Sequence, residues 1–374
     1  MKPIQMVDLK SQYHKIKKEV DKKIEEVIES SAFIKGYAVD EFQKQLEKYL
    51  KVKHVIPCGN GTDALQAALM ALHLQPEDEV ITTPFTFIAT AEVAMLLKLK
   101  VVFVDVEPTT FNIDVNLIEE KITPKTKAII PVHLFGQCCN MEKIMELAEK
   151  YDIAVIEDAC QSIGAQYSFS DGTVKQSGTI GTIGCTSFFP SKNLGCFGDG
   201  GALFTNDDLL AKKLRAITNH GMSKCYYHDV IGMNSRLDSI QAAVLSVKLK
   251  HLDEYIEARQ NAATIYTMFL SNHSKINTPV KALYSTHVYH QYTLRLQDVD
   301  RDKLRDKLNE NGIPSMVYYP IPLHLQKVFS FCGWKKDDFP IAESLSDSVL
   351  SLPMHTELTR SQIQYTCKTL LNEI

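Results

Sequence analysis

Hydrophobic residues recur at helical spacing through the N-terminal part of the chain. Two series of apolar residues lie three or four positions apart, as one face of a helix requires. The first series is Ile16, Val20, Ile24, Val27 and Ile28, and the second is Val39, Phe42, Leu46 and Leu50 around a candidate cap at Asp40. This pattern predicts two amphipathic helices at the start of the chain.

Short apolar runs then alternate with helix-like segments. The runs are residues 55–57, 79–82, 101–106, 128–132 and 153–156, and the helix-like segments are 62–73, 89–98, 115–121 and 140–150. Alternating strands and helices predict an α/β fold with a mostly parallel sheet that is covered on both faces. Two further strand-like runs, 185–189 and 201–205, are joined by a glycine-rich connection and end the alternation.

The C-terminal part of the chain has a different pattern. A long helical stretch begins near Leu252. The segments after it are a strand at 288–296, a helix that carries Leu304 and Leu308 and closes at Gly312, a strand at 316–319, and a last helix at 363–371 begun by Thr359. We therefore predict a large domain over residues 1–250 and a smaller α+β domain over residues 251–374.

Charge and composition narrow the classes of function. The chain has 374 residues with 41 Lys and Arg against 45 Asp and Glu, a formal net charge of −4. This balance lacks the clustered basic surface that nucleic-acid binding needs. No apolar stretch is long enough to span a membrane and no leader pattern is present at the start, so we expect a cytoplasmic protein. Nine cysteines without a C-x-x-C pair predict reduced thiols and no structural metal site.

Ligands of parallel α/β sheets bind at the carboxyl ends of the strands, so we expect the catalytic and ligand-binding residues there. After 55–57 comes a glycine turn with Gly61, Thr62 and Asp63, which opens a helix whose first amides can hold a phosphate. The alternative is a tight turn in which Thr62 or Asp63 only caps the helix. After 79–82, the turn 84–90 places Phe87 where it can stack on a flat ligand, although a core position is the alternative.

Two further strand ends carry charged residues. The run 153–156 leads into Glu157 and Asp158, and burial of the Asp158 carboxylate requires a positive or hydrogen-bonding partner such as a protonated ring nitrogen. Helix capping or an arginine pair is the alternative. After 185–189, Lys192 lies in an apolar, glycine-rich turn where desolvation favours the neutral, nucleophilic amine that forms a Schiff base. A solvated surface lysine is the alternative.

These four features together match the needs of one cofactor. Pyridoxal phosphate requires amides and hydroxyls for its phosphate, a flat neighbour for its ring, a carboxylate at its ring nitrogen and a lysine at its aldehyde. The combination is far more specific than any single feature. The sequence therefore predicts pyridoxal phosphate as the cofactor.

The motifs resemble those of the DegT/DnrJ/StrS family of sugar aminotransferases, which are fold type I pyridoxal-phosphate enzymes. The resemblance is carried by residues 7–10, 60–65, 157–159, 187–192 and 234–238. It implies that Lys192 binds the cofactor covalently and that Asp158 contacts the ring nitrogen. It also implies Gln161 beside the ring, Phe87 stacked on it, and Gly61, Thr62, Asp63 and Ser187 around the phosphate.

The resemblance further implies a homodimer in which Asn234 reaches the phosphate site of the other subunit. The segment 185–201 looks most like the subgroup that acts on UDP-2-acetamido-2-deoxy-3-oxo-glucuronate in surface polysaccharide biosynthesis. Two features depart from this subgroup: Asn219 stands where an arginine can occur, and the loop 223–228 is less basic. We nominate Arg236 for an anionic substrate group, with Tyr319 and His324 at the sugar; an ion pair with Asp238 and simple packing are the alternatives.

The predicted reaction is transfer of an amino group from L-glutamate to a nucleotide-linked keto sugar, with Lys192 as tether and base. Within the family, a 4-keto-6-deoxy nucleotide sugar is an alternative substrate and sugar dehydration an alternative reaction. In dehydratases of the family histidine replaces the lysine, so Lys192 favours transamination. A nucleotide-sugar dehydrogenase would use the turn 59–64 as a dinucleotide site, but it needs neither Asp158 nor Lys192. A non-catalytic regulator with the same fold is the other rival.

Overall fold

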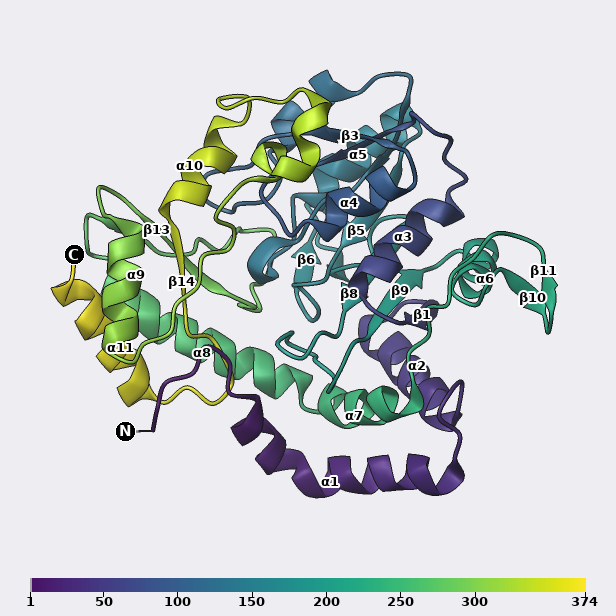
Figure 1. Ribbon diagram of the computed structural model, residues 1–374, viewed down its shortest axis with the longest axis horizontal. Helices are drawn as coiled ribbons and strands as arrows, with labels where there is room; N and C mark the ends of the chain where they lie inside the picture. The colour runs from purple at the N-terminus through teal and green to yellow at the C-terminus, as the bar shows by residue number, and fades with distance from the viewer. Residues whose placement is uncertain (1) are drawn as a thin grey trace.

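A seven-stranded sheet forms the centre of the protein (Figure 1). The computed structural model describes residues 2–374, and the strand order in the sheet is β1-β9-β8-β5-β4-β2-β3. The strands are β1 (His54–Cys58), β2 (Glu79–Thr82), β3 (Lys100–Phe103), β4 (Thr126–Ile129), β5 (Ala154–Asp158), β8 (Ile183–Ser187) and β9 (Gly201–Thr205). The predicted runs are thus all strands, with ends that differ by a few residues.

The strand directions decide where the functional strand ends lie. The strands β3, β2, β4, β5 and β8 pair in parallel, whereas β9 runs antiparallel to both β8 and β1. The strand β1 therefore points the same way as the parallel set. As a result, the carboxyl ends of β1, β2, β5 and β8 meet at one edge of the sheet. The predicted mostly parallel sheet is confirmed.

Neighbouring residues along each strand point to opposite faces, and each face has its own helical layer. Val55, Ile81, Ile129 and Val155 pack with one layer of helices, and the residues beside them in the strands pack with the other. The first layer contains α2 (Tyr37–Leu50), α5 (Met141–Tyr151) and α7 (Ser239–Leu249), and the second contains α3 (Gly61–Ala71), α4 (Ala89–Leu96) and α6 (Asp208–Ile217). Because both faces are covered, the strands lack polar alternation.

Some helices differ from the prediction. The helix α1 (Leu9–Ser30) packs on α7 through Ile16 and Val20, and α2 begins after Gly36, so Asp40 lies in its first turn and is not the cap. The segment 115–121 forms two short 3₁₀ helices, Val115–Leu117 and Glu119–Lys121. The sequence gives no periodic signal for α7 because nearly all of its residues are buried, so apolar and polar faces do not alternate.

The helix α8 (Leu252–Leu270) leads to the C-terminal elements (Figure 1). There the antiparallel sheet β12-β13-β14 packs with helices around a separate cluster of buried residues. The elements are β12 (Ile276–Asn277), β13 (Tyr292–Leu296), α9 (Arg301–Glu310), α10 (Pro340–Ser348), β14 (Val349–Leu352) and α11 (Arg360–Asn372). The predicted strand 316–319 is reduced to one bridge between Met316 and Ser351. As predicted, Thr359 caps the last helix, where it forms a capping box with Gln362.

Part of the C-terminal chain returns to the large sheet. The rings of Phe329, Trp334 and Phe339 pack on Phe103 of β3, with ring centroids 6.2, 4.4 and 6.0 Å away. The amides of Ile341 and Ala342 at the start of α10 donate to the Asp105 carboxylate at 2.9 Å each. The chain beyond residue 250 thus packs in two places, and the predicted domain boundary stays a prediction.

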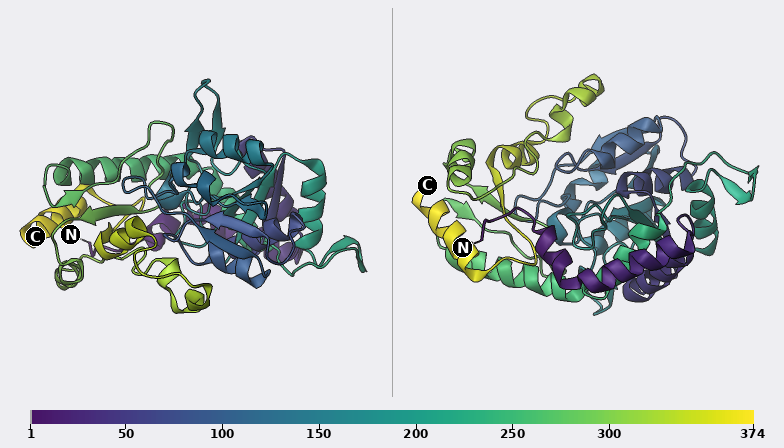
Figure 2. Two further views of the ribbon diagram at one scale, coloured as in Figure 1. Left: turned by 90° about the horizontal axis from the view of Figure 1, so that it is seen from above. Right: turned by 60° about the horizontal axis from the view of Figure 1, so that its bottom comes forward.

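Two antiparallel hairpins lie outside the main sheet. The hairpin β6 (Gln166–Ser168) and β7 (Val174–Gln176) pairs through Tyr167 and Lys175. The hairpin β10 (Met222–Lys224) and β11 (Tyr227–His228) stands off from the body beyond α6 (Figure 2). At its tip Tyr226 is 87% exposed, so this hairpin makes few contacts within one copy of the chain. Across residues 2–374, no helix is both long and apolar enough to cross a membrane.

Candidate active site

A cavity of about 610 Å³ opens at the carboxyl edge of the main sheet. Its walls come from the turns after β1, β2, β5 and β8 and from two segments of the C-terminal chain. Nine residues nominated from the sequence line it: Gly61, Thr62, Asp63, Phe87, Asp158, Gln161, Ser187, Lys192 and Tyr319. Parallel strands explain this convergence, because their carboxyl ends lie together although the residues are far apart in the chain.

The N-terminus of α3 forms one end of the cavity. Asn60 is its cap, and the Asn60 Oδ1 accepts the amide of Asp63 at 2.8 Å. Neither Thr62 nor Asp63 caps the helix, so that alternative is wrong. No partner for the amides of Gly61 and Thr62 is found among residues 2–374. Free amides at a helix start hold anions such as phosphate.

Gly61 has no side chain, and only a glycine fits in the close contact between the start of α3 and the end of β8. A Cβ at Gly61 would lie 2.7 Å from the Ser187 Cβ and 3.0 Å from the Cys160 Sγ. Both distances are shorter than atoms of this kind tolerate. The glycine therefore lets the start of α3 approach the end of β8, and Ser187 and the helix amides face the same space.

The two acids at the end of β5 have separate roles. Glu157 is fully buried and accepts the amides of Gly178, Ile180 and Gly181 at 2.9, 2.6 and 2.6 Å. It also pairs with His133 Nε2 at 2.9 Å. Because the His133 Nδ1 accepts the Cys139 amide at 3.1 Å, Nε2 carries the hydrogen and donates to Glu157. Glu157 is thus a structural residue behind the cavity.

Asp158 faces the cavity itself and is 5% exposed. Its carboxylate accepts the Thr90 hydroxyl at 2.7 Å and the Cys160 amide at 3.2 Å. No lysine, arginine or histidine among residues 2–374 bonds to this carboxylate, so the alternative of an arginine pair is wrong. A positively charged ligand atom in the cavity would supply the missing charge.

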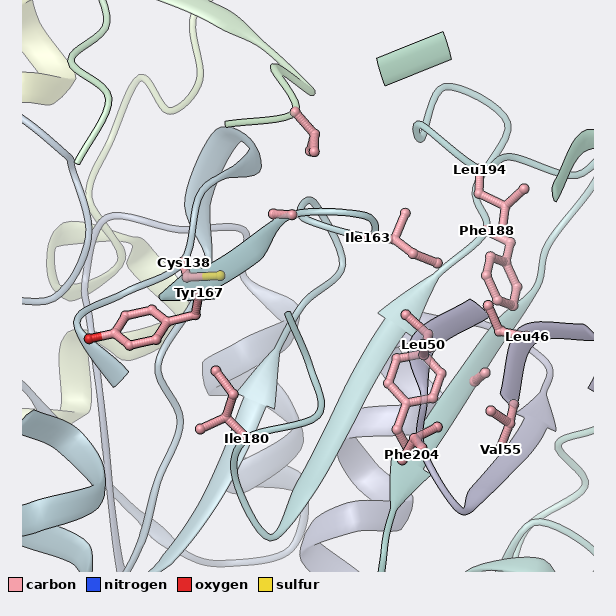
Figure 3. Packing of buried hydrophobic residues seen from close by; sticks show 14 of the residues in the cluster. Leu46, Leu50, Val55, Cys138, Ile163, Tyr167, Ile180, Phe188, Leu194 and Phe204 are labelled. Carbon is pink, nitrogen blue, oxygen red and sulfur yellow. The ribbon is translucent and has the colours of Figure 1, made fainter. Parts of the chain in front are cut away.

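The loop that carries Lys192 is anchored in the core on both sides. Phe188 and Leu194 are fully buried, and Figure 3 shows them packed beside Leu46 of α2. The Lys192 amide donates to the Phe189 carbonyl at 2.8 Å and closes the turn. Burial lowers the pKa of the Lys192 amine, while Cys160 and Asp158 oppose that shift. A lowered pKa raises the share of free amine, the form that attacks a carbonyl.

Another part of the cavity wall is formed by the rings of Phe87 and Tyr319 and the side-chain amide of Gln161. Phe87 is 55% exposed, so the predicted alternative of a core position is wrong for this ring. The Gln161 Nε2 donates to the Tyr319 hydroxyl at 3.2 Å, and the Gln161 Oε1 accepts the Phe135 amide at 2.9 Å. Burial raises the pKa of Tyr319, which keeps its hydroxyl protonated. Phe87 and Tyr319 lie 6.5 Å apart between ring centroids.

Three nominated residues lie outside the cavity. Asn234 is exposed and Arg236 is half-buried. The Asp238 carboxylate caps α7 by accepting the Gln241 amide at 2.9 Å, so the alternative of an Arg236–Asp238 ion pair is wrong. His324 is 2% exposed and pairs with Glu343 at 3.0 Å, away from the residues that line the cavity. The structure thus places His324 in a packing position under α10.

Other residues that line the cavity were not nominated from the sequence. His290 and Gln291 precede β13 in the C-terminal chain, and Phe135 and Tyr318 complete the wall. His290, Gln291 and Tyr318 come from the C-terminal chain and not from the carboxyl ends of the main sheet, so only the fold reveals them. Phe135 follows the run 128–132, and that strand end could have pointed to it. Asn60 and Ser191 also line the cavity, and their neighbours in the glycine turn and the lysine turn could have pointed to them.

The charge of the cavity is negative. Asp63, Asp158 and Asp199 line it, and Lys192 is the only lysine or arginine among its lining residues in the described chain. Such a cavity has too few cations of its own to hold the phosphates and carboxylates of several anionic ligands.

Comparisons with known proteins match the whole chain. The profile of the DegT/DnrJ/EryC1/StrS aminotransferase family matches residues 14–371. The chain belongs to this family. It is 48% identical to the "Pleiotropic regulatory protein" of Geobacillus stearothermophilus, with 97% of this chain and 96% of that protein covered. It is 45% identical to the "UDP-2-acetamido-2-deoxy-3-oxo-D-glucuronate aminotransferase" of Pseudomonas aeruginosa, with 99% and 100% covered.

Solved structures agree with this assignment. The crystal structure of S. venezuelae DesV in complex with a ketimine intermediate superposes with a TM-score of 0.95 at 36% identity, with 100% of this chain and 98% of that chain covered. The structure of ntda from Bacillus subtilis with bound cofactor PMP gives a TM-score of 0.88 at 32% identity, with 98% and 82% covered. This family member is a fold type I sugar aminotransferase that acts on nucleotide sugars and depends on pyridoxal phosphate. The alternative of a dehydrogenase is therefore wrong.

The residues of the cavity fit pyridoxal phosphate. The free amides at the start of α3, with the space beside Gly61, suit a phosphate, and the buried Asp158 carboxylate suits a protonated ring nitrogen. The Thr86 Oγ1 and the His290 Nδ1 are buried beside the cavity without hydrogen-bond partners in the described chain. Unpartnered buried polar atoms are costly, and a polar ligand would satisfy them.

The close contact at Gly61 predicts that a side chain at this position weakens cofactor binding. Replacement Gly61→Ala places a methyl group against Ser187, and we expect the affinity for pyridoxal phosphate to fall about 10-fold or more, as overpacking costs about 1–3 kcal/mol. The affinity is measured by titrating the cofactor-free protein and following absorbance. The control is Gly198→Ala, whose Cβ would meet only the flexible side chain of Gln241, at 3.3 Å. Equal cofactor affinity in the two variants would contradict the assignment of this end to the phosphate.

Proposed function

We propose that the enzyme transfers the amino group of L-glutamate to UDP-2-acetamido-2-deoxy-3-oxo-glucuronate in surface polysaccharide biosynthesis. The observation that carries the proposal is the end-to-end match to the P. aeruginosa enzyme named for this substrate. A second relative supports amination at C3: the "UDP-N-acetyl-3-dehydro-alpha-D-glucosamine 3-aminotranferase" of Acidithiobacillus ferrooxidans is 43% identical, with 96% of this chain and 95% of that protein covered. The two named substrates differ in whether the sugar carries a carboxylate.

The roles of the cavity residues follow from their surroundings. When bound, pyridoxal phosphate supplies an electron sink for the carbon that loses or gains a proton. The amine Nζ of Lys192, whose pKa is lowered by burial, would hold the cofactor at its aldehyde carbon; once the incoming amino donor has displaced it, the free amine would carry the proton at the substrate carbon. Asp158 holds the proton on the ring nitrogen, and Thr90 keeps its carboxylate oriented. Gln161 and Tyr319 form a hydrogen-bonded wall beside the ring.

The remaining residues orient the ligands. Thr62, Asp63 and Ser187 line the same cavity as the α3 amides and would hold the phosphate, and Phe87 would stack on the ring. Tyr319 also lines the space for the sugar. His324 bonds to Glu343 of α10 and is not among the residues that line the cavity, so we assign it no contact with the sugar. Lys192, which dehydratases of the family replace by histidine, supports transamination over the alternative of dehydration.

The charge of the cavity supports a homodimer with shared active sites. One copy supplies only Lys192 as a cation beside three carboxylates, although phosphate, diphosphate and carboxylate groups must bind. Arg236 is half-buried and has no acidic partner in the described chain, and Asn234 is exposed nearby. A large apolar side chain is also exposed at the cavity, since Phe189 lines it and is 52% exposed. A second copy that covers this ring would bring its Arg236 and Asn234 to the cavity.

The substrate is tested with three sugars and the purified holoenzyme. L-glutamate is supplied with UDP-2-acetamido-2-deoxy-3-oxo-glucuronate, with its counterpart lacking the carboxylate, or with a 4-keto-6-deoxy nucleotide sugar. We expect kcat/KM to be at least about 10-fold higher for the first, because a charge-assisted contact to Arg236 is worth more than about 1 kcal/mol. Arg236→Gln should remove this preference. A higher kcat/KM for either other sugar would overturn the proposed substrate.

The shared site is tested by mixing two impaired variants. Lys192→Ala inactivates both sites of its own dimer, and Arg236→Ala lowers kcat/KM for the carboxylated sugar about 10-fold at both sites of its own. After subunit exchange in an equal mixture, half of the dimers carry one chain of each kind, and each of these has one intact site, so about a quarter of the wild-type activity should return. Lys192→Ala mixed with Asp158→Ala is the control, since both changes lie in one cavity wall of the same chain. If the first mixture is no more active than the mean of its two parents while exchange is complete, Arg236 does not act across subunits.

A further inference from the structure

His290 is a buried histidine with no hydrogen-bond partner in the cavity that holds Lys192. It is 7% exposed, and its imidazole lines the cavity wall. The Nδ1 is buried and unpartnered, and no other residue in the described chain bonds to the ring. Buried polar groups without partners are rare in native structures and mark places where a ligand or a moving side chain completes the bond.

The backbone near His290 is held in a conformation that ordinary residues avoid. Tyr289 has a φ of +45°, and Gly136, which faces it, has a φ of +119°. A Cβ at Gly136 would lie 2.9 Å from the Tyr289 amide nitrogen and 3.0 Å from that of His290. Left-handed conformations in residues other than glycine cost free energy and concentrate at functional sites. The fold thus bears a cost to place this segment at the cavity wall.

Hydrogen bonds from the lysine turn and from α8 hold the backbone of residues 288–290 in place. The Asn193 side chain, next to Lys192, donates to the Val288 carbonyl at 2.9 Å. From α8, the Arg259 Nη1 donates to the carbonyls of Tyr289 and His290 at 3.1 and 3.3 Å. The backbone at His290 is therefore fixed relative to the turn that carries the lysine.

Most polar groups near His290 already have hydrogen-bond partners, whereas the Lys192 amine has none among residues 2–374 and can donate to the His290 ring. The Asp158 carboxylate is already bonded to Thr90 and to the Cys160 amide, and Arg259 is turned toward backbone carbonyls. Tyr319 is engaged with Gln161. The Lys192 amine has no hydrogen bond in the described chain, and four rotatable bonds let it reach along the wall. Burial, Lys192 and Arg259 lower the pKa of His290 well below its ordinary value, so the ring is neutral and can accept.

We propose that His290 is the positioning residue for the Lys192 amine: its neutral ring accepts a hydrogen bond from Nζ whenever that amine is not bound to the cofactor. The proton stays on the lysine nitrogen, and no bond is made or broken in this step. The contact gives the freed amine one preferred position in the cavity, where the Asp158 carboxylate is already bonded to two protein donors and Asp63 and Asp199 are the other carboxylates. The inference rests on the proposed role of Lys192.

The test follows the reactivity of the lysine without turnover. The full-length protein is freed of cofactor, and the rate at which it captures pyridoxal phosphate is followed by absorbance as a function of pH. An acceptor stabilises the protonated amine, so its loss should lower the apparent pKa of capture. We expect a decrease of about one unit in His290→Phe. His290→Gln, which retains an acceptor, should stay within about 0.3 units of the wild type.

A neighbour on the same segment provides the matched control. The His287 ring stacks on Tyr289, accepts its amide at 3.0 Å and lies outside the cavity. His287→Phe disturbs the segment without removing the proposed acceptor, so its capture pKa should match the wild type. The inference is overturned if His290→Phe titrates like the wild type or if His287→Phe shifts equally. Capture that persists in Lys192→Ala would instead overturn the proposed function, because another lysine would then bind the cofactor.

Discussion

Lys192→Ala should lose at least about 10⁴-fold in kcat while the protein remains folded, because one change removes both the covalent link to the cofactor and the base. The fold should survive because Phe188 and Leu194 anchor the turn from either side. The measurement is product formation from L-glutamate and the keto sugar, together with the absorbance of the bound cofactor. The long-wavelength band of the lysine-linked cofactor should disappear.

An exposed lysine provides the control for this prediction. Lys125 lies in the turn before β4, far along the chain from the cavity, and Lys125→Ala should keep the wild-type rate. Circular dichroism of Lys192→Ala should match the wild type. Turnover close to the wild-type rate in Lys192→Ala would refute the assignment of this lysine. A lost fold would instead show that the turn depends on its side chain.

Glu157→Ala should lower the free energy of unfolding by about 3–5 kcal/mol. The change leaves three buried amides and the His133 ring without an acceptor, and each unpartnered buried group costs about 1–3 kcal/mol. Urea denaturation of the cofactor-free protein measures the effect. Cofactor-free protein is needed because bound ligand adds stability of its own.

The exposed acid Glu120, in the short 3₁₀ helix Glu119–Lys121, is the control for this substitution. Its side chain is 61% exposed, and Glu120→Ala should change the free energy of unfolding by no more than about 0.5 kcal/mol. A loss below about 1 kcal/mol in Glu157→Ala would contradict the view that this carboxylate holds the turn 178–181. The result also separates the two acids at the end of β5, since Asp158 has only two protein donors.

The sequence predicts the catalytic wall of the cavity because of one property of parallel sheets. The ends of β1, β2, β5 and β8 lie together whatever the length of the connections, so residues after apolar runs can be collected without a structure. This principle brought Thr62, Phe87, Asp158 and Lys192 to one place, and the cavity contains all four.

The other wall could not be predicted in this way. His290 and Gln291 reach the cavity because Arg259 and Gly136 hold their segment, and such long-range contacts leave no periodic trace in the chain. The sequence also could not show that Asp158 faces the cavity while Glu157 is buried behind it. Neighbouring residues of a strand face opposite sides, and only the fold shows which side holds the cavity. His324 was nominated from a motif, yet burial against Glu343 keeps it from the cavity.

The two edges of the main sheet are protected at different stages of synthesis. At one edge, β1 contains Pro57, which lacks the amide that a further strand would need. At the other edge, the side chain of Phe103 in β3 packs with the aromatic rings of Phe329, Trp334 and Phe339, which leave the ribosome long after the strand itself. A growing or truncated chain that ends before these rings would therefore expose the apolar Phe103 side chain on an edge strand, where pairing with other chains begins.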